Sequence, residues 1–152
     1  MADTFGHGII VFEETNGVSY LYRAEHPTFM PDPSASEFVN KQVGINFSDA
    51  GVMGLSLSPV YFKNENQILY YRPLSSYALY ALNPNELKNG GHNLHFTGSK
   101  DALGKSQAIG QAFSIDGTLF LGFSSEYAIG CWNRYKPFKI VTKIINFYTS
   151  YS

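Results

Sequence analysis

Short apolar runs broken by glycine, proline and asparagine recur along the chain and predict strands rather than helices. The clearest run lies at 51–58, where Met53, Leu55 and Leu57 alternate with smaller residues. This period of two is that of a strand. Because some of the small residues are glycines, we expect another part of the chain to approach this strand closely. The face opposite the three large residues would hold Val52, Gly54, Ser56 and Ser58.

The first part of the chain predicts a hairpin followed by a loop. Two β-rich runs, at 8–13 and 18–23, flank Asn16-Gly17, a strong signal for a two-residue hairpin turn. Three prolines within His26–Pro33 then predict an extended loop, because proline disfavours both helix and ladder pairing.

Only one helical turn is predicted. Asn83 would be its N-cap, Pro84 its first residue and Gly90 its stop. The rest of the pattern consists of short strands and turns, so the expected fold class is all-β.

Part of the chain occurs twice, with 53–58 matched by 109–114 and 77–83 matched by 127–133. A repeat of about 40–50 residues made of short strands is typical of the blades of a β-propeller. The small-residue strand that opens each copy would be the innermost strand of its blade, because inner strands crowd around the axis.

The predicted strands amount to about two and a half blades. Residues 8–23 would form the outer half of one blade, 51–97 a second and 108–145 a third. A closed propeller needs about four blades or more. We therefore expect an incomplete propeller of four-stranded antiparallel sheets. Its open blade edges favour self-association, so the chain is expected to form oligomers or aggregates.

Composition supports a β fold and narrows the range of partners. The 152 residues include 12 Phe, 11 Tyr, 14 Gly and 7 Pro. The formal net charge of -1 gives no broad electrostatic reason to expect nucleic acid or an anionic membrane as a partner. The first residues lack the regions of a signal peptide, and no apolar stretch has the length of a membrane span.

The residues alone predict no catalytic, metal or cofactor site. Gly104-Lys105-Ser106 is similar to the end of a phosphate-binding loop, but its spacing from the preceding glycine is wrong and no helix pattern follows. His92 and His95 lack a third ligand for zinc. No serine lies in the sequence context of a nucleophile elbow.

Two residues carry expectations that depend on the cellular compartment. Cys131 is the only cysteine, so it is either a small buried apolar residue or a half-cystine whose disulfide partner lies outside this chain. Asn46-Phe-Ser48 is an acceptor sequence for N-glycosylation, which applies only if the chain is exported.

Several segments between Phe5 and Pro137 follow the order of motifs in a known family. The main ones are Phe-Gly-His-Gly-Ile-Ile-Val-Phe at 5–12, His-Pro-Thr-Phe-Met-Pro-Asp-Pro at 26–33, Gly-Val-Met-Gly-Leu-Ser-Leu-Ser-Pro at 51–59, Leu-Tyr-Tyr-Arg-Pro-Leu-Ser-Ser at 69–76 and Gly-Cys-Trp-Asn at 130–133. Together they resemble the yellow/major royal jelly protein family. The resemblance implies a six-bladed β-propeller and a secreted, extracellular insect protein.

The resemblance also implies a function. The chain would be a fragment of a propeller that binds small aromatic amines or catechols and is linked to pigmentation or the melanin pathway. The alternatives are a dopachrome isomerase and a storage or structural protein without a ligand site. No residue stands out as a general acid or base, so no catalytic residue and no cofactor is expected. The ligand-binding candidates, for which ordinary filling of the channel is the competing interpretation, are Met53, Ser106, Gln107 and Gln111.

The final residues depart from the family. We expect a partial propeller at 1–138 and a divergent C-terminal tail at 139–152. A family member would begin with a signal peptide and contain further blades, so a partial gene model is the working hypothesis. Cys131 would then have been separated from its disulfide partner.

Overall fold

The computed structural model describes residues 1–35, 39–40, 45–46, 49–60, 66–90, 97–99, 106–124, 126–133 and 135–143. Within these ranges the chain forms strands and short 3-10 helices. In chain order they are β1 (Ala2–Asp3), β2 (Gly8–Thr15), β3 (Val18–Glu25), η1 (Pro27–Phe29), η2 (Pro33–Ala35), β4 (Val39–Asn40), β5 (Ile45–Asn46), β6 (Val52–Leu57), β7 (Leu69–Pro73), β8 (Leu79–Leu82), η3 (Pro84–Gly90), β9 (Thr97–Ser99), β10 (Ala108–Phe113), β11 (Leu119–Phe123), β12 (Ala128–Asn133) and β13 (Lys136–Lys143).

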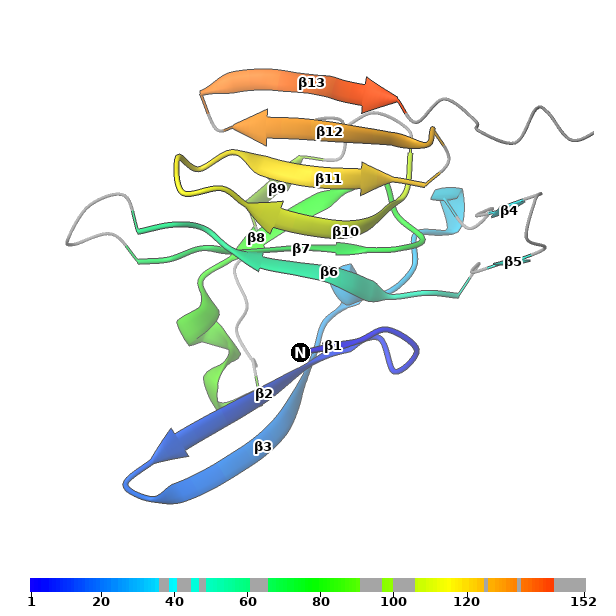
Figure 1. Ribbon diagram of the computed structural model, residues 1–152. Coiled ribbons are helices and arrows are strands. Elements are labelled where there is room, and N and C mark those ends of the chain that lie inside the picture. The colour runs from blue at the N-terminus through cyan, green and yellow to red at the C-terminus, as the bar shows by residue number, and fades with distance from the viewer. Residues whose placement is uncertain are drawn as a thin grey trace, which may run out of the picture.

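The strands pair into antiparallel sheets, which confirms the all-β prediction. We call them blade 1 (order β1-β2-β3), blade 2 (order β6-β7-β8-β9) and blade 3 (order β10-β11-β12-β13), while β4 and β5 pair separately. The edge strands β6 and β10 lie next to each other, so blades 2 and 3 meet along their inner strands (Figure 1). One three-stranded and two four-stranded sheets agree with the prediction of an incomplete propeller of about two and a half blades.

The predicted hairpin is confirmed as β2 and β3. Its register runs from the pair Gly8 and Glu25 to the pair Thr15 and Val18. The turn residues have φ angles of 54° at Asn16 and 76° at Gly17. Type I′ turns require this left-handed conformation, which glycine and asparagine adopt at the lowest cost. The Asn-Gly pair therefore fixes the register of the hairpin.

The proline-rich segment differs from its prediction. Instead of a fully extended loop, it forms two single 3-10 turns, η1 and η2. Proline has a φ angle suited to the first position of a helix, and it opens both turns. The His26 side chain caps η1 by accepting a hydrogen bond from the Thr28 backbone N–H. The helical turn predicted at Asn83–Gly90 is present as η3, with the Asn83 side chain bonded to the Asn85 N–H.

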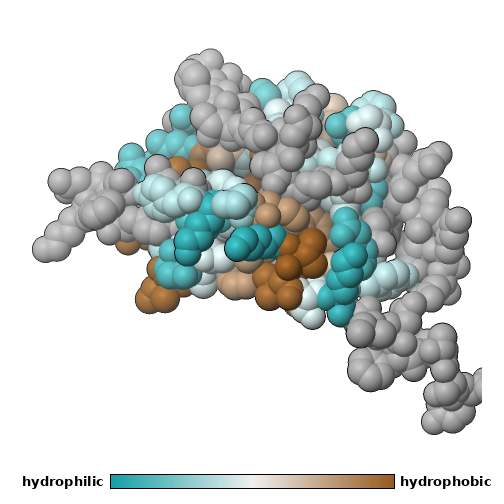
Figure 2. Space-filling model, turned by 90° about the horizontal axis from the view of Figure 1, so that it is seen from above, coloured by the Kyte–Doolittle hydropathy of each residue, from teal (hydrophilic) through white to brown (hydrophobic). Residues whose placement is uncertain are grey.

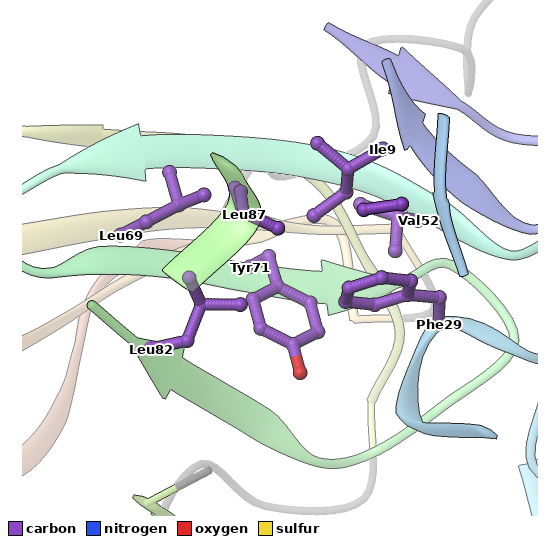
Figure 3. Close-up of a cluster of buried hydrophobic side chains, with 8 residues drawn as sticks. Ile9, Phe29, Val52, Leu69, Tyr71, Leu82 and Leu87 are labelled. Carbon is purple, nitrogen blue, oxygen red and sulfur yellow. The ribbon is translucent and has the colours of Figure 1, made fainter. Parts of the chain in front are cut away.

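The main hydrophobic core lies between blades 1 and 2 and is closed by η1 and η3 (Figure 3). Figure 3 shows Tyr71 of β7 pointing toward Phe29 of η1, and their ring centroids are 5.1 Å apart in an edge-to-face arrangement. The Tyr71 hydroxyl is 2.6 Å from the Thr28 hydroxyl, so this buried polar atom has a partner. The cluster is completed by Ile9, Ala24, Val52, Leu69, Leu82 and Leu87.

Stability at alkaline pH is expected to depend on Tyr71. Burial raises the pKa of Tyr71 well above its ordinary value, so the folded chain keeps a proton that the unfolded chain releases above about pH 10. The free energy of unfolding should therefore fall as the pH rises above that value, because the unfolded state then binds fewer protons. Urea unfolding followed by circular dichroism between pH 8 and pH 11 should show a smaller fall for Tyr71→Phe.

Titration of Arg72 does not affect this comparison between the wild-type chain and Tyr71→Phe. Burial lowers the pKa of Arg72 to about 10, so it contributes the opposite slope between that pH and its ordinary pKa. Both proteins keep Arg72, and the difference between them isolates Tyr71. Identical pH dependence in the two proteins would contradict the buried, protonated tyrosine.

The faces of β6 differ from the prediction because of a β-bulge. Val52 pairs with Pro73 and Gly54 with Arg72, so Met53 is an extra residue without a partner in β7. An extra residue reverses the alternation of the side chains that follow it. Val52 consequently packs in the core between blades 1 and 2, whereas Gly54 and Ser56 lie against Gln111 of β10. Placing Val52 on the same face as Gly54 was wrong.

A second core joins blades 2 and 3. Leu79 of β8 packs with buried side chains of blade 3, and Tyr70 of β7 packs against Phe113 and Trp132 at ring-centroid distances of 5.1 and 5.7 Å. The buried members of blade 3 are Ala108, Leu119, Leu121, Phe123 and Ala128.

The fourth strand of blade 3 crosses the expected boundary between 138 and 139. β13 spans Lys136–Lys143 and pairs with β12, for example through Cys131 and Lys139. Residues 139–143 therefore continue the sheet of blade 3. The division into a propeller at 1–138 and a tail at 139–152 remains a prediction.

Candidate functional site

A buried polar cluster lies where the blade 2 and blade 3 sheets meet at the start of β10. It contains two of the predicted ligand-binding residues, Ser106 and Gln107, both buried. We call it the Arg72 cluster and define it as Arg72, Ser75, Ser76, Ser106 and Gln107, all of which are buried. Arg72 and the two blade 2 serines come from β7 and the turn that follows it.

Arg72 is held by backbone carbonyls and an aromatic ring. Its Nη2 donates to the carbonyls of Ser76, at 3.2 Å, and Ser106, at 2.5 Å, and its Nε also donates to Ser76. The guanidinium carbon lies 5.7 Å from the centroid of the Phe123 ring. Burial lowers the pKa of Arg72 to about 10, because taking a cation out of water penalises its charged form. The Arg72 side chain thus links blade 2 to blade 3 through its contacts with the Ser106 carbonyl and the Phe123 ring.

Two polar atoms of the Arg72 cluster lack hydrogen-bond partners. They are Nη1 of Arg72 and Oγ of Ser106. Among the described residues, Arg72 also has no ion pair with a carboxylate. Buried polar atoms without partners are costly, and they often mark places where water or an ion binds.

Gln107 and Gln111 use their amides to join separate parts of the chain. Gln107 Nε2 donates to the backbone carbonyl of Ala35 at 3.1 Å, and the backbone carbonyl of Gln107 accepts bonds from the N–H and hydroxyl of Ser124. Gln111 Nε2 donates to Ser56 Oγ at 3.1 Å and to the Tyr70 carbonyl at 2.8 Å. Both amides therefore contribute to packing between segments, and their role in binding a ligand remains a prediction.

Met53 stands apart from the three other candidates because its side chain is exposed. As the bulge residue of β6, it is 39% exposed. The register of β10 shows a matching irregularity between Ala108 and Gln111, and Ile109 in that interval is 47% exposed. Ile109 is the residue that the sequence repeat aligns with Met53. Two neighbouring inner strands thus expose one apolar side chain each at the same repeat position.

Other kinds of site receive no support from the described part of the chain. No three histidine, cysteine or acidic side chains gather there in a way that could hold a metal ion. None of the helices in the ranges given above is both long and apolar enough to cross a membrane. His92, His95 and residues 100–105 lie outside the described residues.

Known proteins match nearly the whole chain. A sequence profile described as Major royal jelly protein matches residues 1–143. The chain belongs to the major royal jelly protein family. Major royal jelly protein 5 of Apis mellifera is 32% identical over 140 residues, which cover 90% of this chain and 22% of that protein. Major royal jelly protein 2 of the same species is 32% identical, covering 90% and 29%.

The relatives also include the yellow proteins. Protein yellow of Drosophila yakuba is 27% identical over 141 residues, which cover 90% of this chain and 26% of that protein. The chain therefore spans less than a third of the length of these curated relatives. The matches confirm the resemblance to the yellow/major royal jelly protein family, whose propeller fold agrees with the observed sheets.

Three of the segments that carry the family resemblance, 26–33, 51–59 and 69–76, are joined by backbone hydrogen bonds beside the Arg72 cluster. The His26–Pro33 segment contacts blade 2 through the Asp32 N–H, which donates to the Ser75 carbonyl at 2.7 Å. The Gly51 N–H donates to the Thr4 carbonyl at 2.8 Å, and its own carbonyl accepts from the Leu74 N–H. In this family member, residues distant in sequence are thus assembled at one end of β6.

Two further predictions have a place in the fold. Cys131 is a half-buried free cysteine of β12, and its disulfide with a partner outside this chain stays a prediction. Asn46 belongs to β5, and its glycosylation stays a prediction as well.

The sequence did not identify Arg72 or Ile109 as residues of interest. A signal for Arg72 was present, because it is the one charged residue in the β-rich run Leu69–Pro73. A signal for Ile109 was also present in its alignment with Met53. Neither signal predicts a site by itself, because a cation is usually exposed and an isoleucine in a strand usually packs in the core.

Proposed function

We propose that the chain forms part of a secreted yellow-type propeller. This propeller binds small aromatic amines or catechols in its central channel and acts in pigmentation. Membership of the family supports this class of protein. The observation that carries the proposal is the pair of exposed apolar side chains, Met53 and Ile109, on adjacent inner strands. Inner strands of a propeller surround its channel.

The chemistry of these residues suits an aromatic ring. A thioether and a branched alkyl group offer apolar, polarizable surface, and methionine sulfur makes favourable contacts with aromatic rings. Asp49 lies just before β6, with an exposed carboxylate 3.4 Å from the His7 ring. A carboxylate at this end of β6 would attract the ammonium group of an amine ligand.

Titration calorimetry of the 152-residue chain with dopamine, serotonin and dopachrome tests the proposal. Replacing Met53 or Ile109 with glutamine is expected to weaken binding about tenfold, which corresponds to about 1.4 kcal/mol. Leu57→Gln is the matched control, because Leu57 is 47% exposed at the other end of β6 and should leave affinity unchanged. Asp49→Asn should weaken the binding of dopamine and serotonin, which carry an ammonium group, more than the binding of dopachrome, which carries none.

Dopachrome absorbance separates the competing functions. Heat of binding without faster loss of absorbance supports a binding protein. Loss faster than in buffer would instead support an isomerase. Absence of both heat and conversion for all three compounds would contradict the proposal and favour a storage or structural protein.

A further inference from the structure

Arg72 differs from the other cations of the described chain because it is 0% exposed. The other described cations, which are Arg23, Lys88, Lys136, Lys139 and Lys143, are exposed. Figure 2 views the chain from the side of β13 and shows hydrophilic side chains of the ordinary kind, at the surface among apolar ones. A buried charge is costly unless it is paired and hydrogen-bonded. The charge of Arg72 must therefore be compensated inside the protein.

The contacts already described for Arg72 compensate its charge only in part. Nε and Nη2 donate to the Ser76 carbonyl, and Nη2 also donates to the Ser106 carbonyl. The face of the guanidinium lies 5.7 Å from the Phe123 ring centroid. Carbonyl dipoles and an aromatic ring attract a cation, but they carry no net charge. These contacts use Nε and Nη2 and leave Nη1 without an acceptor.

Two buried donors next to each other have no acceptor. Nη1 of Arg72 carries N–H donors, and the hydroxyl of Ser106 carries one more. Neither atom has a hydrogen-bond partner. The two residues are in direct contact, because Nη2 bonds the Ser106 carbonyl at 2.5 Å. A group that only accepts hydrogen bonds would satisfy both donors, and a negative charge on that group would also neutralise the guanidinium.

No carboxylate of the described residues supplies this charge. None of the ion pairs within the described ranges includes Arg72. Asp32 bonds the Ser75 carbonyl through its N–H, but its carboxylate accepts the N–H and hydroxyl of Ser34 at 2.9 and 2.7 Å. Burial lowers the pKa of Arg72 to about 10, and the group that opposes this shift is the Tyr77 phenol. A phenol is ordinarily neutral at neutral pH, so it does not balance the cation.

We propose that the Arg72 cluster binds a chloride ion between Nη1 of Arg72 and Oγ of Ser106. Chloride accepts hydrogen bonds only, and it carries a single negative charge. Because both residues are 0% exposed, the ion enters as the chain folds, and a large organic anion is excluded. The site does not include Met53 or Ile109, so the inference goes beyond the proposed function.

The dependence of stability on chloride tests the site in the wild-type chain. Urea unfolding is followed by circular dichroism, from chloride-free buffer upward, with gluconate replacing chloride so that the ionic strength stays constant. An ion that binds only the folded state shifts the equilibrium toward it. The ratio of folded to unfolded chain should therefore rise about tenfold once chloride reaches about ten times its dissociation constant. Unfolding that does not change with chloride would overturn the proposal.

Ser106→Ala should reverse its effect as chloride is added. In chloride-free buffer it should be as stable as the wild-type chain or more stable, because it removes a buried donor that has no acceptor. With chloride it should be less stable, because the ion has lost a donor. Arg72→Met, which lacks both the charge and the donors, should show no response to chloride. An unchanged chloride response in Ser106→Ala would contradict the assigned site.

Ser58→Ala is the matched control. Ser58 is also a buried serine, at 5% exposure, but its Oγ accepts the Ile68 N–H at 2.9 Å. The substitution should lower stability by the same amount at every chloride concentration. If the loss in Ser58→Ala depended on chloride as strongly as that in Ser106→Ala, the chloride effect would be general and the proposal would be wrong.

Crystals grown in bromide locate the ion directly. Bromide is a heavier analogue of chloride, and its anomalous signal should lie within hydrogen-bonding distance of Nη1 of Arg72 and Oγ of Ser106. A water molecule or a carboxylate at that place would overturn the proposal. Both experiments are done without an amine or a catechol, so failure of the chloride site leaves the proposed function untouched, and the reverse also holds.

Discussion

Replacing Arg72 with alanine is expected to lower the free energy of unfolding by about 3–5 kcal/mol. The guanidinium binds the carbonyls of Ser76 and Ser106 and packs over the Phe123 ring, all out of contact with water. Alanine would leave these buried carbonyls without donors and open a cavity between blades 2 and 3. Urea unfolding followed by Trp132 fluorescence, at one protein concentration, measures the loss.

Three further variants assign the effect to hydrogen bonding, volume or charge. Arg72→Met keeps most of the volume but has no donors, and Arg72→Lys keeps a charge but lacks the planar fork that bonds two carbonyls. Each should retain part of the stability that alanine loses. Arg23→Ala is the matched surface control, since Arg23 is exposed and its partners are the carboxylates of Glu25 and Asp3; it should change stability little. Equal effects at Arg72 and Arg23 would contradict the buried role of Arg72.

The sequence predicted the order and type of the strands well because the relevant signals are local. Alternation of apolar and polar residues depends only on neighbours in the chain, and Asn16-Gly17 determines a turn by its own backbone preferences. The internal repeat added long-range information, because two copies of one unit must fold alike and stack. These signals were enough for the prediction of a partial propeller.

The sequence could not predict features that depend on pairing or packing. The bulge at Met53 reverses the faces of β6, yet a bulge becomes visible only when the partner strand β7 is aligned with it. From its place in a strand, Arg72 cannot be told apart from a cation at the surface. It is buried because Phe123 and the Ser106 carbonyl of the following blade pack against it. The segment that forms the 3-10 turns at Pro27 and Pro33 contacts blade 2, and the positions of the prolines in the sequence do not reveal these contacts.

The site candidates illustrate the same limit. The repeat placed Met53, Ser106, Gln107 and Gln111 on inner strands or between blades, and the structure has them there. It brings Ser106 and Gln107 together in the Arg72 cluster, while Gln111 bonds to blade 2 and Met53 stays exposed. Which of these faces a ligand depends on side-chain direction, which the sequence pattern of a bulged strand does not determine.

Gly51→Ala is expected to destabilise the fold by about 3 kcal/mol, at the upper end of the usual range for adding a methyl group to a tightly packed site. A Cβ at Gly51 would lie 2.7 Å from the Phe29 carbonyl oxygen and 3.0 Å from the Thr4 carbonyl oxygen. Both are backbone atoms. The Thr4 carbonyl also accepts the Gly51 N–H, so moving it away would break the bond that links blade 1 to β6. Thermal and urea unfolding of the variant would measure the change.

Two other glycines provide the comparison. Gly110 lies in β10, and a Cβ there would have no neighbour within 4 Å, so Gly110→Ala should leave stability unchanged or raise it slightly. A Cβ at Gly130 would lie 2.5 Å from the rings of Phe123 and Phe138. Side chains can shift more easily than backbone, so the loss of stability in Gly130→Ala should lie between the losses in Gly51→Ala and Gly110→Ala. If Gly51→Ala unfolds at the same urea concentration as Gly110→Ala, the close approach of Thr4 and Phe29 to the start of β6 is wrong.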